Sequence, residues 1–269
     1  MSGQGGIHDR AVTHIGFFDS GVGGLSVMRH ALHRVDGRPL LYVADSAYAP
    51  YGARDAQQII DRSCRISRFL IEQGAGAIVV ACNTATAVAV DALRAEFAVP
   101  VVGMEPGLKP AARMTESGQV AVLATRGTLH SDRYARLLSD HGDEIVVHER
   151  ICHDWIEAVE QGDLDSPRTY DLVNAALQPL HAAGVDTYVL GCTHYPFLLP
   201  VIRSIVGDQV HLVDPGPAVV AQLRRRLGIS ASTDTESPVR LFSSGNPATL
   251  AALAGALVNL EAPCEPLPL

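Results

Sequence analysis

Short apolar runs rich in Val, Ile and Ala alternate along this chain with longer segments in which apolar residues return every three or four positions. The short runs have the composition of buried strands, and the longer segments have the period of amphipathic helices. Their alternation predicts βα units and parallel sheets. We expect strands near residues 13–18, 40–45, 77–81, 101–104, 119–124, 144–148, 187–191, 210–213 and 239–242. We expect helices near residues 25–35, 55–72, 84–96, 128–140, 149–161, 167–183, 218–227 and 247–258.

Two of the predicted strands end in the same way. The run 77–81 ends at Cys82, and the run 187–191 ends at Cys192. A residue with an amide or hydroxyl side chain follows each cysteine at once. Ligands of open parallel sheets bind beyond the carboxyl ends of the strands, so both thiols are expected at such an edge. The matched pair indicates one site built between two related halves.

The strands fall into two series, which predicts two doubly wound α/β domains. The first domain is expected to span residues 12–99 and to be completed by residues 214–258. The second domain is expected to span residues 100–213. The glycine-rich segment 1–11 and the proline-rich segment 259–269 are predicted to be loose tails.

Composition narrows the class of protein. The 269 residues are 47% hydrophobic, enough for a sizeable core, and carry a net charge of −8. An acidic chain without a basic stripe argues against nucleic acid as a partner, because the three arginines at 224–226 are too few for a binding patch. Five scattered cysteines, without a CxxC pair or metal-ligand spacing, predict free thiols and no metal site. No signal peptide or membrane-spanning run is visible, so we expect a cytoplasmic protein without a membrane partner.

The first predicted strand ends at Asp19 and Ser20, directly before a glycine-rich turn and a predicted helix. Free backbone N–H groups at a helix start form an anion-binding corner. The turn does not match the dinucleotide-binding pattern and no Walker-type lysine follows it, so a small carboxylate is the better ligand. Asp19 alone would be an ordinary helix cap. Beside Cys82, it is a candidate partner of a substrate ammonium group or of a thiol.

An isolated cysteine after an apolar strand usually serves packing, but the paired arrangement of Cys82 and Cys192 weakens that interpretation. A helix N-terminus lowers the pKa of a thiol, so both are predicted to be reactive, and the other three cysteines structural. His194, two residues after Cys192, is the best histidine candidate for proton transfer, although most histidines here are expected to be structural. Side chains suited to a carboxylate ligand are Asn83, Thr84, Thr128 and Thr193, with Arg126 as an equally good candidate for an exposed structural role.

Four segments together resemble the signature motifs of glutamate racemase, a member of the cofactor-independent aspartate/glutamate racemase superfamily. They are the segments 19–24 (DSGVGG), 50–52 (PYG), 81–86 (ACNTAT) and 191–196 (GCTHYP), in the order of that family. The resemblance implies an α/β fold of two pseudosymmetric domains with parallel sheets and an active-site cleft between them. It also implies cofactor-independent catalysis without a metal, with L- or D-glutamate as the small-molecule substrate. The substrate contacts that it implies are Asp19, Ser20, Tyr51, Gly52, Asn83, Thr84, Thr193 and His194.

The same resemblance implies a two-base mechanism in which Cys82 and Cys192 are the acid/base pair. Cys82 would take the Cα proton of D-glutamate with Asp19 nearby, and Cys192 that of L-glutamate with His194 nearby. Family members of this kind supply D-glutamate for peptidoglycan, and a homodimer is left open. One departure is the segment Ile151-Cys152-His153-Asp154-Trp155, where the family often has a Cys-Pro helix start.

Other classes of protein remain as alternatives. An aspartate or hydantoin racemase, or a related decarboxylase, would share the cysteines or the fold. A thiol redox protein would need a CxxC pair or a resolving cysteine nearby. A non-catalytic amino-acid-binding protein could have the same cleft, but it would not need paired thiols. A pyridoxal-phosphate enzyme is disfavoured because Lys109, the only lysine, stands in no such motif.

Overall fold

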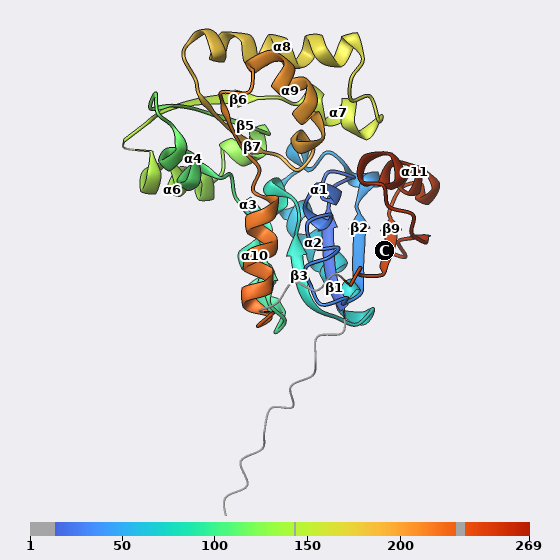
Figure 1. Ribbon diagram of the computed structural model, residues 1–269. Coiled ribbons are helices and arrows are strands. Elements are labelled where there is room, and N and C mark those ends of the chain that lie inside the picture. Colours follow the sequence, from blue (N-terminus) through green and yellow to red (C-terminus); the bar gives the residue numbers. More distant parts are fainter. Residues whose placement is uncertain (1–13, 143, 230–234) are drawn as a thin grey trace, which may run out of the picture.

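The computed structural model describes residues 14–142, 144–229 and 235–269 and contains two sheets, in both of which all strands run parallel (Figure 1). The first sheet has the order β10-β9-β2-β1-β3-β4 and the second has the order β6-β5-β7-β8. The first sheet consists of β1 (His14–Asp19), β2 (Leu40–Ala44), β3 (Ala75–Val80), β4 (Val101–Val102), β9 (Val239–Ser243) and β10 (Cys264–Pro266). The second consists of β5 (Gln119–Ala124), β6 (Val146–Ile151), β7 (Thr187–Gly191) and β8 (His211–Val213). The predicted α/β class with parallel sheets is confirmed.

Helices connect the strands of both sheets, as the alternating pattern predicts. The α-helices are α1 (Leu25–Met28), α2 (Ala56–Glu72), α3 (Asn83–Glu96), α4 (Leu108–Met114), α5 (Arg126–Leu129), α6 (Asp132–His141), α7 (Asp154–Glu160), α8 (Pro167–Ala182), α9 (Leu199–Val206), α10 (Gly216–Arg226) and α11 (Pro247–Val258). Short 3-10 helices span Ser46–Tyr48, Tyr51–Ala53 and Tyr195–Leu198. The long helix α2 begins after Asp55, whose carboxylate accepts the N–H of Gln57, as expected of a good N-cap residue. In the described parts of the chain, no helix combines the length and the apolar composition needed to cross a membrane.

Strand β1 lies in the middle of the first sheet and is covered on both faces, which explains its continuous apolar sequence. Phe17 and Phe18, which are adjacent residues of β1, point to opposite faces of the sheet and join different apolar clusters. Phe18 packs in the cluster that contains Ile66 of α2. Phe17 belongs to a cluster that extends into the second sheet through Leu190 and to Trp155 of α7. One apolar core therefore joins the two sheets and fixes the site between them.

Two boundaries differ from the predictions because pairing between strands decides them. The predicted domain boundary at 99/100 assigns Val101–Val102 to the second half, whereas β4 pairs with β3 in the first sheet. The predicted strand 144–148 and helix 149–161 also meet in the wrong place. Strand β6 continues to Ile151 because it stays in register with the whole of β5, and α7 starts only at Asp154.

Two further predictions are wrong in their local structure. The predicted helix 25–35 ends at Met28, and residues beyond it form tight turns that close with i→i+3 hydrogen bonds, such as that from the N–H of Arg34 to the carbonyl of Ala31. The segment 259–269 is not a loose tail, because Cys264–Pro266 pairs with β9 as an edge strand. Proline is compatible with an edge position, where one side of the strand needs no donor. The predicted tail 1–11 lies outside the described residues.

Candidate functional site

Loops at the carboxyl ends of strands from both sheets surround one narrow pocket with a cavity volume of about 20 Å³. The first sheet contributes the residues after β1, β2 and β3, and the second sheet those after β5 and β7, together with α7. Nine of the ten predicted site residues line this pocket: Ser20, Tyr51, Gly52, Cys82, Asn83, Thr84, Cys192, Thr193 and His194. The tenth, Asp19, lies fully buried beside it. Both thiols therefore face the same space, from opposite halves of the molecule.

Asp19 is held by the glycine-rich turn that follows β1. Its carboxylate accepts the backbone N–H groups of Ser20 and Gly24, each at 2.6 Å, and the hydroxyl of Thr193 at 3.0 Å. A Cβ atom at Gly24 would come within 2.8 Å of the Asp19 Cβ and 2.9 Å of the Tyr42 hydroxyl, so glycine is required there. Burial raises the pKa of Asp19, although the charge of His194 acts in the opposite direction. Asp19 is therefore a desolvated carboxyl group that accepts hydrogen bonds from both halves of the molecule.

Cys82 is the N-cap residue of α3, and its Sγ accepts the N–H of Ala85 at 3.4 Å. The Sγ lies 4.0 Å from the Ser20 hydroxyl. Burial, followed by the negative charge of Asp19, raises the pKa of Cys82 well above its usual value. The expectation that the helix N-terminus would lower this pKa is wrong, because the hydrogen bond from Ala85 acts in that direction but is outweighed. Burial and the neighbouring carboxylate therefore favour the thiol form of Cys82.

Cys192 has a different environment. It follows β7 but caps no α-helix, since a turn and the 3-10 helix Tyr195–Leu198 separate it from α9. Its Sγ lies 3.6 Å from Nδ1 of His194, and Nε2 of His194 lies 2.7 Å from Oε1 of Glu160. Burial alone would lower the pKa of His194, but the contacts with Cys192 and Glu160 outweigh it and raise that pKa well above its usual value. Cys192 therefore lies against one end of a buried histidine–carboxylate pair.

Glu160 is a functional candidate that the sequence analysis missed. Its Oε1 also accepts the N–H of Val22 at 2.9 Å, so it connects α7 to the glycine-rich turn of the first half. Burial acts to raise its pKa, but the hydrogen bond from His194 lowers it overall. A Cβ atom at Gly21 would overlap with this carboxylate. In the sequence, Glu160 is one of several acidic residues on an amphipathic helix, and no local pattern marks it.

Amide and hydroxyl groups form another wall of the pocket. Both polar side-chain atoms of Asn83 are buried and have no hydrogen-bond partner among the described residues. The hydroxyl of Thr84 lies 3.0 Å from that of Thr125, which in turn lies 3.0 Å from that of Thr128. Buried polar groups without partners are rare in folded proteins, so Asn83 is an unused donor and acceptor that a polar ligand can satisfy. Thr125 was not predicted as a site residue.

Other candidates lie outside this pocket. Arg126 is exposed and does not line it. Thr128 contacts the site only through the hydroxyl chain. Cys152 is buried, and its burial raises the pKa of its thiol to about 12. Its carbonyl accepts the hydroxyl of Tyr195, on which the ring of Trp155 packs edge-on. The unusual segment 151–155 therefore supports the Cys192 loop from behind.

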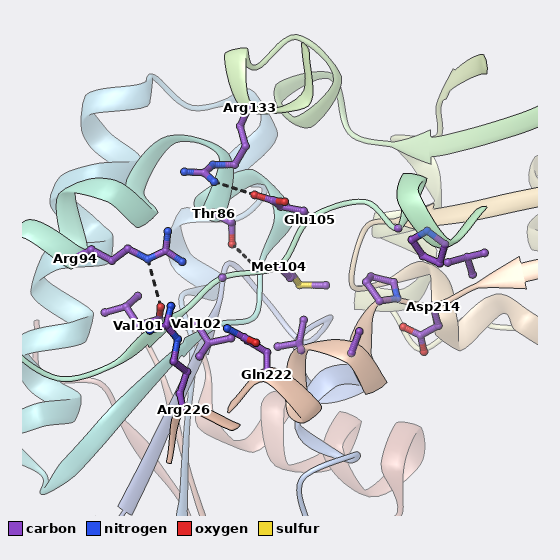
Figure 2. A pocket seen from close by; sticks show the side chains of 17 residues that line it. Thr86, Arg94, Val101, Val102, Met104, Glu105, Arg133, Asp214, Gln222 and Arg226 are labelled. Carbon is purple, nitrogen blue, oxygen red and sulfur yellow. Dashed lines mark hydrogen bonds and ion pairs between the residues drawn. The ribbon is translucent and has the colours of Figure 1, made fainter. Parts of the chain in front are cut away.

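A second and larger pocket, with a cavity volume of about 350 Å³, lies where the chain crosses between the two sheets (Figure 2). It is lined by residues after β4 and β8 and by α10, and Figure 2 shows Arg133 directed at Glu105 on its rim. None of the predicted site residues lines it. We therefore assign the chemistry to the smaller pocket, which contains the two thiols. No cluster of metal-ligating side chains is found within the described residues.

Comparisons with known proteins identify the family of this chain and structures with a similar fold. The sequence model of the Asp/Glu/hydantoin racemase family matches residues 16–223. A glutamate racemase of Methylococcus capsulatus is 51% identical over 239 residues, which cover 88% of each chain. The crystal structure of Escherichia coli glutamate racemase in complex with L-glutamate and the activator UDP-MurNAc-Ala matches with a TM-score of 0.85 and 31% identity, over 95% of this chain and 98% of that one. A Francisella tularensis glutamate racemase in complex with D-glutamate matches with a TM-score of 0.79 and 25% identity, over 96% and 98% of the two chains.

Proposed function

Because this chain belongs to the Asp/Glu/hydantoin racemase family and is an isomerase that acts on glutamate, we propose that Cys82 and Cys192 interconvert L- and D-glutamate as a pair of acid/base groups. The observation that carries the proposal is that both thiols line one buried pocket from opposite halves of the molecule. The two thiols have different surroundings. A two-base reaction needs such a difference, because one group must accept a proton while the other donates one.

The proposed reaction conserves all protons. A thiolate takes the Cα proton and becomes a thiol, leaving a carbanion next to the α-carboxylate. The opposite thiol then donates its proton to the other face of the same carbon and becomes a thiolate. No cofactor is consumed, and the enzyme ends with its two protonation states exchanged. The raised pKa of Cys82 supports its role as the proton donor in the direction in which Cys192 accepts the Cα proton. In that direction the substrate is L-glutamate.

Stabilisation of the carbanion is assigned to hydrogen-bond donors in a pocket with little room for water. We propose that the side chains of Asn83 and Thr84 and the backbone N–H of Thr193, whose hydroxyl already donates to Asp19, bind the carboxylate groups of the substrate. We propose that Ser20 and Asp19 bind its ammonium group. The unpartnered amide of Asn83 supports this assignment. Preorganised donors in a desolvated site are worth more than the same donors in water, because the local dielectric constant is low.

Four features of the protein are part of the same proposal. We propose that the chain forms two domains, with β4 in the first. We propose a cytoplasmic location, which the five free cysteines support. We also propose that the protein supplies D-glutamate for peptidoglycan and that it forms a homodimer. Light scattering on the purified protein tests the dimer. Depletion of the protein in its host, followed by rescue with added D-glutamate, tests the peptidoglycan role.

The decisive experiment follows the optical rotation of L- and D-glutamate with the purified protein and no added cofactor. The expected result is racemisation in both directions, and none with aspartate. Cys82→Ser and Cys192→Ser are assayed beside the wild type. Binding of glutamate without turnover by the wild type would instead indicate an amino-acid-binding protein, and near-normal racemisation by either variant would rule out the two-thiol scheme.

A further inference from the structure

A buried ion pair lies behind the candidate active site and takes no part in the chemistry proposed above. Asp45, at the end of β2, is fully buried, and Arg62 of α2 is 6% exposed. Nε of Arg62 donates to one oxygen of Asp45 at 2.9 Å, and Nη2 donates to the other at 2.7 Å. This is the planar, two-bonded geometry that arginine forms with carboxylates and lysine cannot.

The pair extends to the pocket through one further hydrogen bond. The hydroxyl of Tyr51 donates to Oδ2 of Asp45 at 2.6 Å. Burial, followed by the charge of Asp45, raises the pKa of Tyr51 above its usual value, so the phenol keeps the proton that it donates. A phenol has a single proton, and here Asp45 accepts it. The Tyr51 hydroxyl is therefore not available to donate a hydrogen bond to a substrate.

The position of the backbone around Tyr51 follows from these contacts. Residues 49–52 line the pocket, and the ring of Tyr51 anchors them from the side of the protein core. Within the described residues, no hydrogen bond inside the protein uses the N–H groups of Tyr51 and Gly52. The backbone N–H of Asp45 also donates to the carbonyl of Asp19 at 2.9 Å, which ties the same anchor to the buried carboxyl of the site.

Stability alone is a weak reason for this pair. Removing two charges from water is costly, and apolar side chains of similar volume are often as stabilising. Here the cost is greater still, because Nη1 of Arg62 is buried and has no partner among the described residues. The ring of Tyr48, 4.0 Å from the guanidinium carbon, covers its outer side. A costly, directional pair that ends at one pocket residue is better explained by the geometry it imposes.

We propose that Asp45 and Arg62 are positioning residues that act through Tyr51. They hold residues 50–52 so that the N–H groups of Tyr51 and Gly52 point at a carboxylate of the bound amino acid. The inference deepens the proposed function and rests on it for the identity of the ligand. A defect in positioning weakens the binding of both enantiomers alike, because the carboxylates, unlike the Cα proton, are common to both.

The test compares Arg62→Gln with Arg65→Gln, a matched control on the same helix whose side chain is exposed. We expect Arg62→Gln to raise KM about tenfold for both L- and D-glutamate and to change kcat much less, the pattern of lost uniform binding. The Kd for glutamate from calorimetry should rise by a similar factor. Arg65→Gln should match the wild type. A purely structural role would lower the melting temperature of Arg62→Gln and leave KM of the folded enzyme unchanged.

Tyr51→Phe keeps the ring and removes only the hydroxyl, so it carries the test if Arg62→Gln does not fold. It should raise KM in the same way, and the double variant Tyr51→Phe/Arg62→Gln should be no worse than Arg62→Gln, since both changes break one chain of contacts. Unchanged KM in Arg62→Gln or Tyr51→Phe, or losses that multiply in the double variant, would overturn the inference. Wild-type protein that binds glutamate without turning it over would refute the proposed function alone, because the Kd values still test positioning. Wild-type protein that neither binds nor racemises glutamate would overturn both.

Discussion

The two thiols follow similar stretches of sequence but occupy different local structures. Cys82 caps a 14-residue helix and accepts a backbone N–H from its first turn. Cys192 is followed by a turn and a 3-10 helix, and its nearest polar contact is the ring of His194. A strand end, a small residue and a cysteine are thus not enough to predict how a thiol is surrounded. The residues that follow, and what packs against them, decide that.

The electrostatic difference between the two environments matters more than the difference in backbone. Near Cys82 the closest charged group is the Asp19 carboxyl, which favours the thiol. Near Cys192 it is His194, whose pKa is raised by its contacts with Cys192 and Glu160. Chemically identical side chains thus have different electrostatic surroundings, which is how one site can hold an acid and a base at the same pH.

The two environments are also coupled. The hydroxyl of Thr193, from the Cys192 loop, donates to Asp19 at 3.0 Å, and the hydroxyl of Ser26 donates to the carbonyl of Thr193 at 2.8 Å. A Cβ atom at Gly23 would approach Thr193 and His194 within 2.4 Å. Close approach of the two halves is therefore built into the glycine-rich turn. A substitution near Cys82 should therefore also affect Cys192, and the reverse. Variants on each side measure how independently the two thiols act.

The largest effect is expected from exchanging sulfur for oxygen. Cys82→Ser and Cys192→Ser should each lower racemisation at least about 10³-fold, because a serine hydroxyl is a far poorer acid and base at neutral pH. In deuterated water, Cys82→Ser should still exchange the Cα proton of L-glutamate, and Cys192→Ser that of D-glutamate. Proton NMR of each enantiomer measures this exchange. If both variants exchange the same enantiomer, the assignment of one thiol to each face is wrong.

Changes to the partners of the thiols should separate the two sides without removing either thiol. Asp19→Asn and His194→Asn should each lower kcat/KM about 10²-fold, and equally in both directions, because the equilibrium constant between enantiomers is one. Asp19→Asn slows the step at Cys82, so L-glutamate should acquire deuterium faster than it racemises. His194→Asn should produce the same excess with D-glutamate. Equal exchange of both enantiomers in either variant would argue against separate partners.

Glu160→Gln should remove the charge that holds His194 protonated while keeping its hydrogen bonds. We expect a loss of about 1–1.5 kcal/mol in the free energy of unfolding, the difference between a charge-assisted and a neutral bond. Because the pKa of His194 is raised, the stabilisation by the Glu160–His194 pair is fully present below the usual histidine pKa of 6.5 and is lost as the pH rises through the raised pKa. Because the pKa of Glu160 is lowered, the same stabilisation is fully present above the usual glutamate pKa of 4.5 and is lost as the pH falls through the lowered pKa.

Denaturant unfolding of the wild type and Glu160→Gln at several pH values tests this prediction. The difference in unfolding free energy should therefore be largest between about pH 4.5 and 6.5 and should shrink on both sides of that window. Glu157→Gln, on the same helix but exposed, is the control. A difference that is constant with pH would show that no ion pair forms.

The smallest effect concerns the helix cap that only Cys82 provides. Serine is a favoured N-cap residue, so Cys82→Ser should cost about 0.5 kcal/mol less unfolding free energy than Cys192→Ser. Denaturant unfolding of the two variants in the same buffer measures the difference. A larger loss in Cys82→Ser would mean that the sulfur packs there more than it caps.

Local sequence patterns were enough to predict much of the secondary structure. The strand 119–124 was predicted at its observed bounds, and the helices 55–72, 84–96, 167–183 and 247–258 lie within a residue or so of α2, α3, α8 and α11. These elements have strong periodicity, clear caps, or both, such as Asp55 before α2 and Ser166 before α8. The misplaced elements, β4, β6 and β10, have bounds that depend on a partner strand distant in sequence. Single-sequence patterns contain no information about that register.

The sequence by itself determined the order of strands and helices, the two thiols at strand ends, and the motifs that identify the family, because each of these depends on residues close together in the chain. Only the tertiary structure decided that Glu160 supports His194, that Asp45 and Arg62 anchor Tyr51, and that the pKa of Cys82 is raised and not lowered. The physical reason is that hydrogen bonds, burial and charge act through space. Val22 and Glu160 are 138 positions apart in the chain and 2.9 Å apart in the fold.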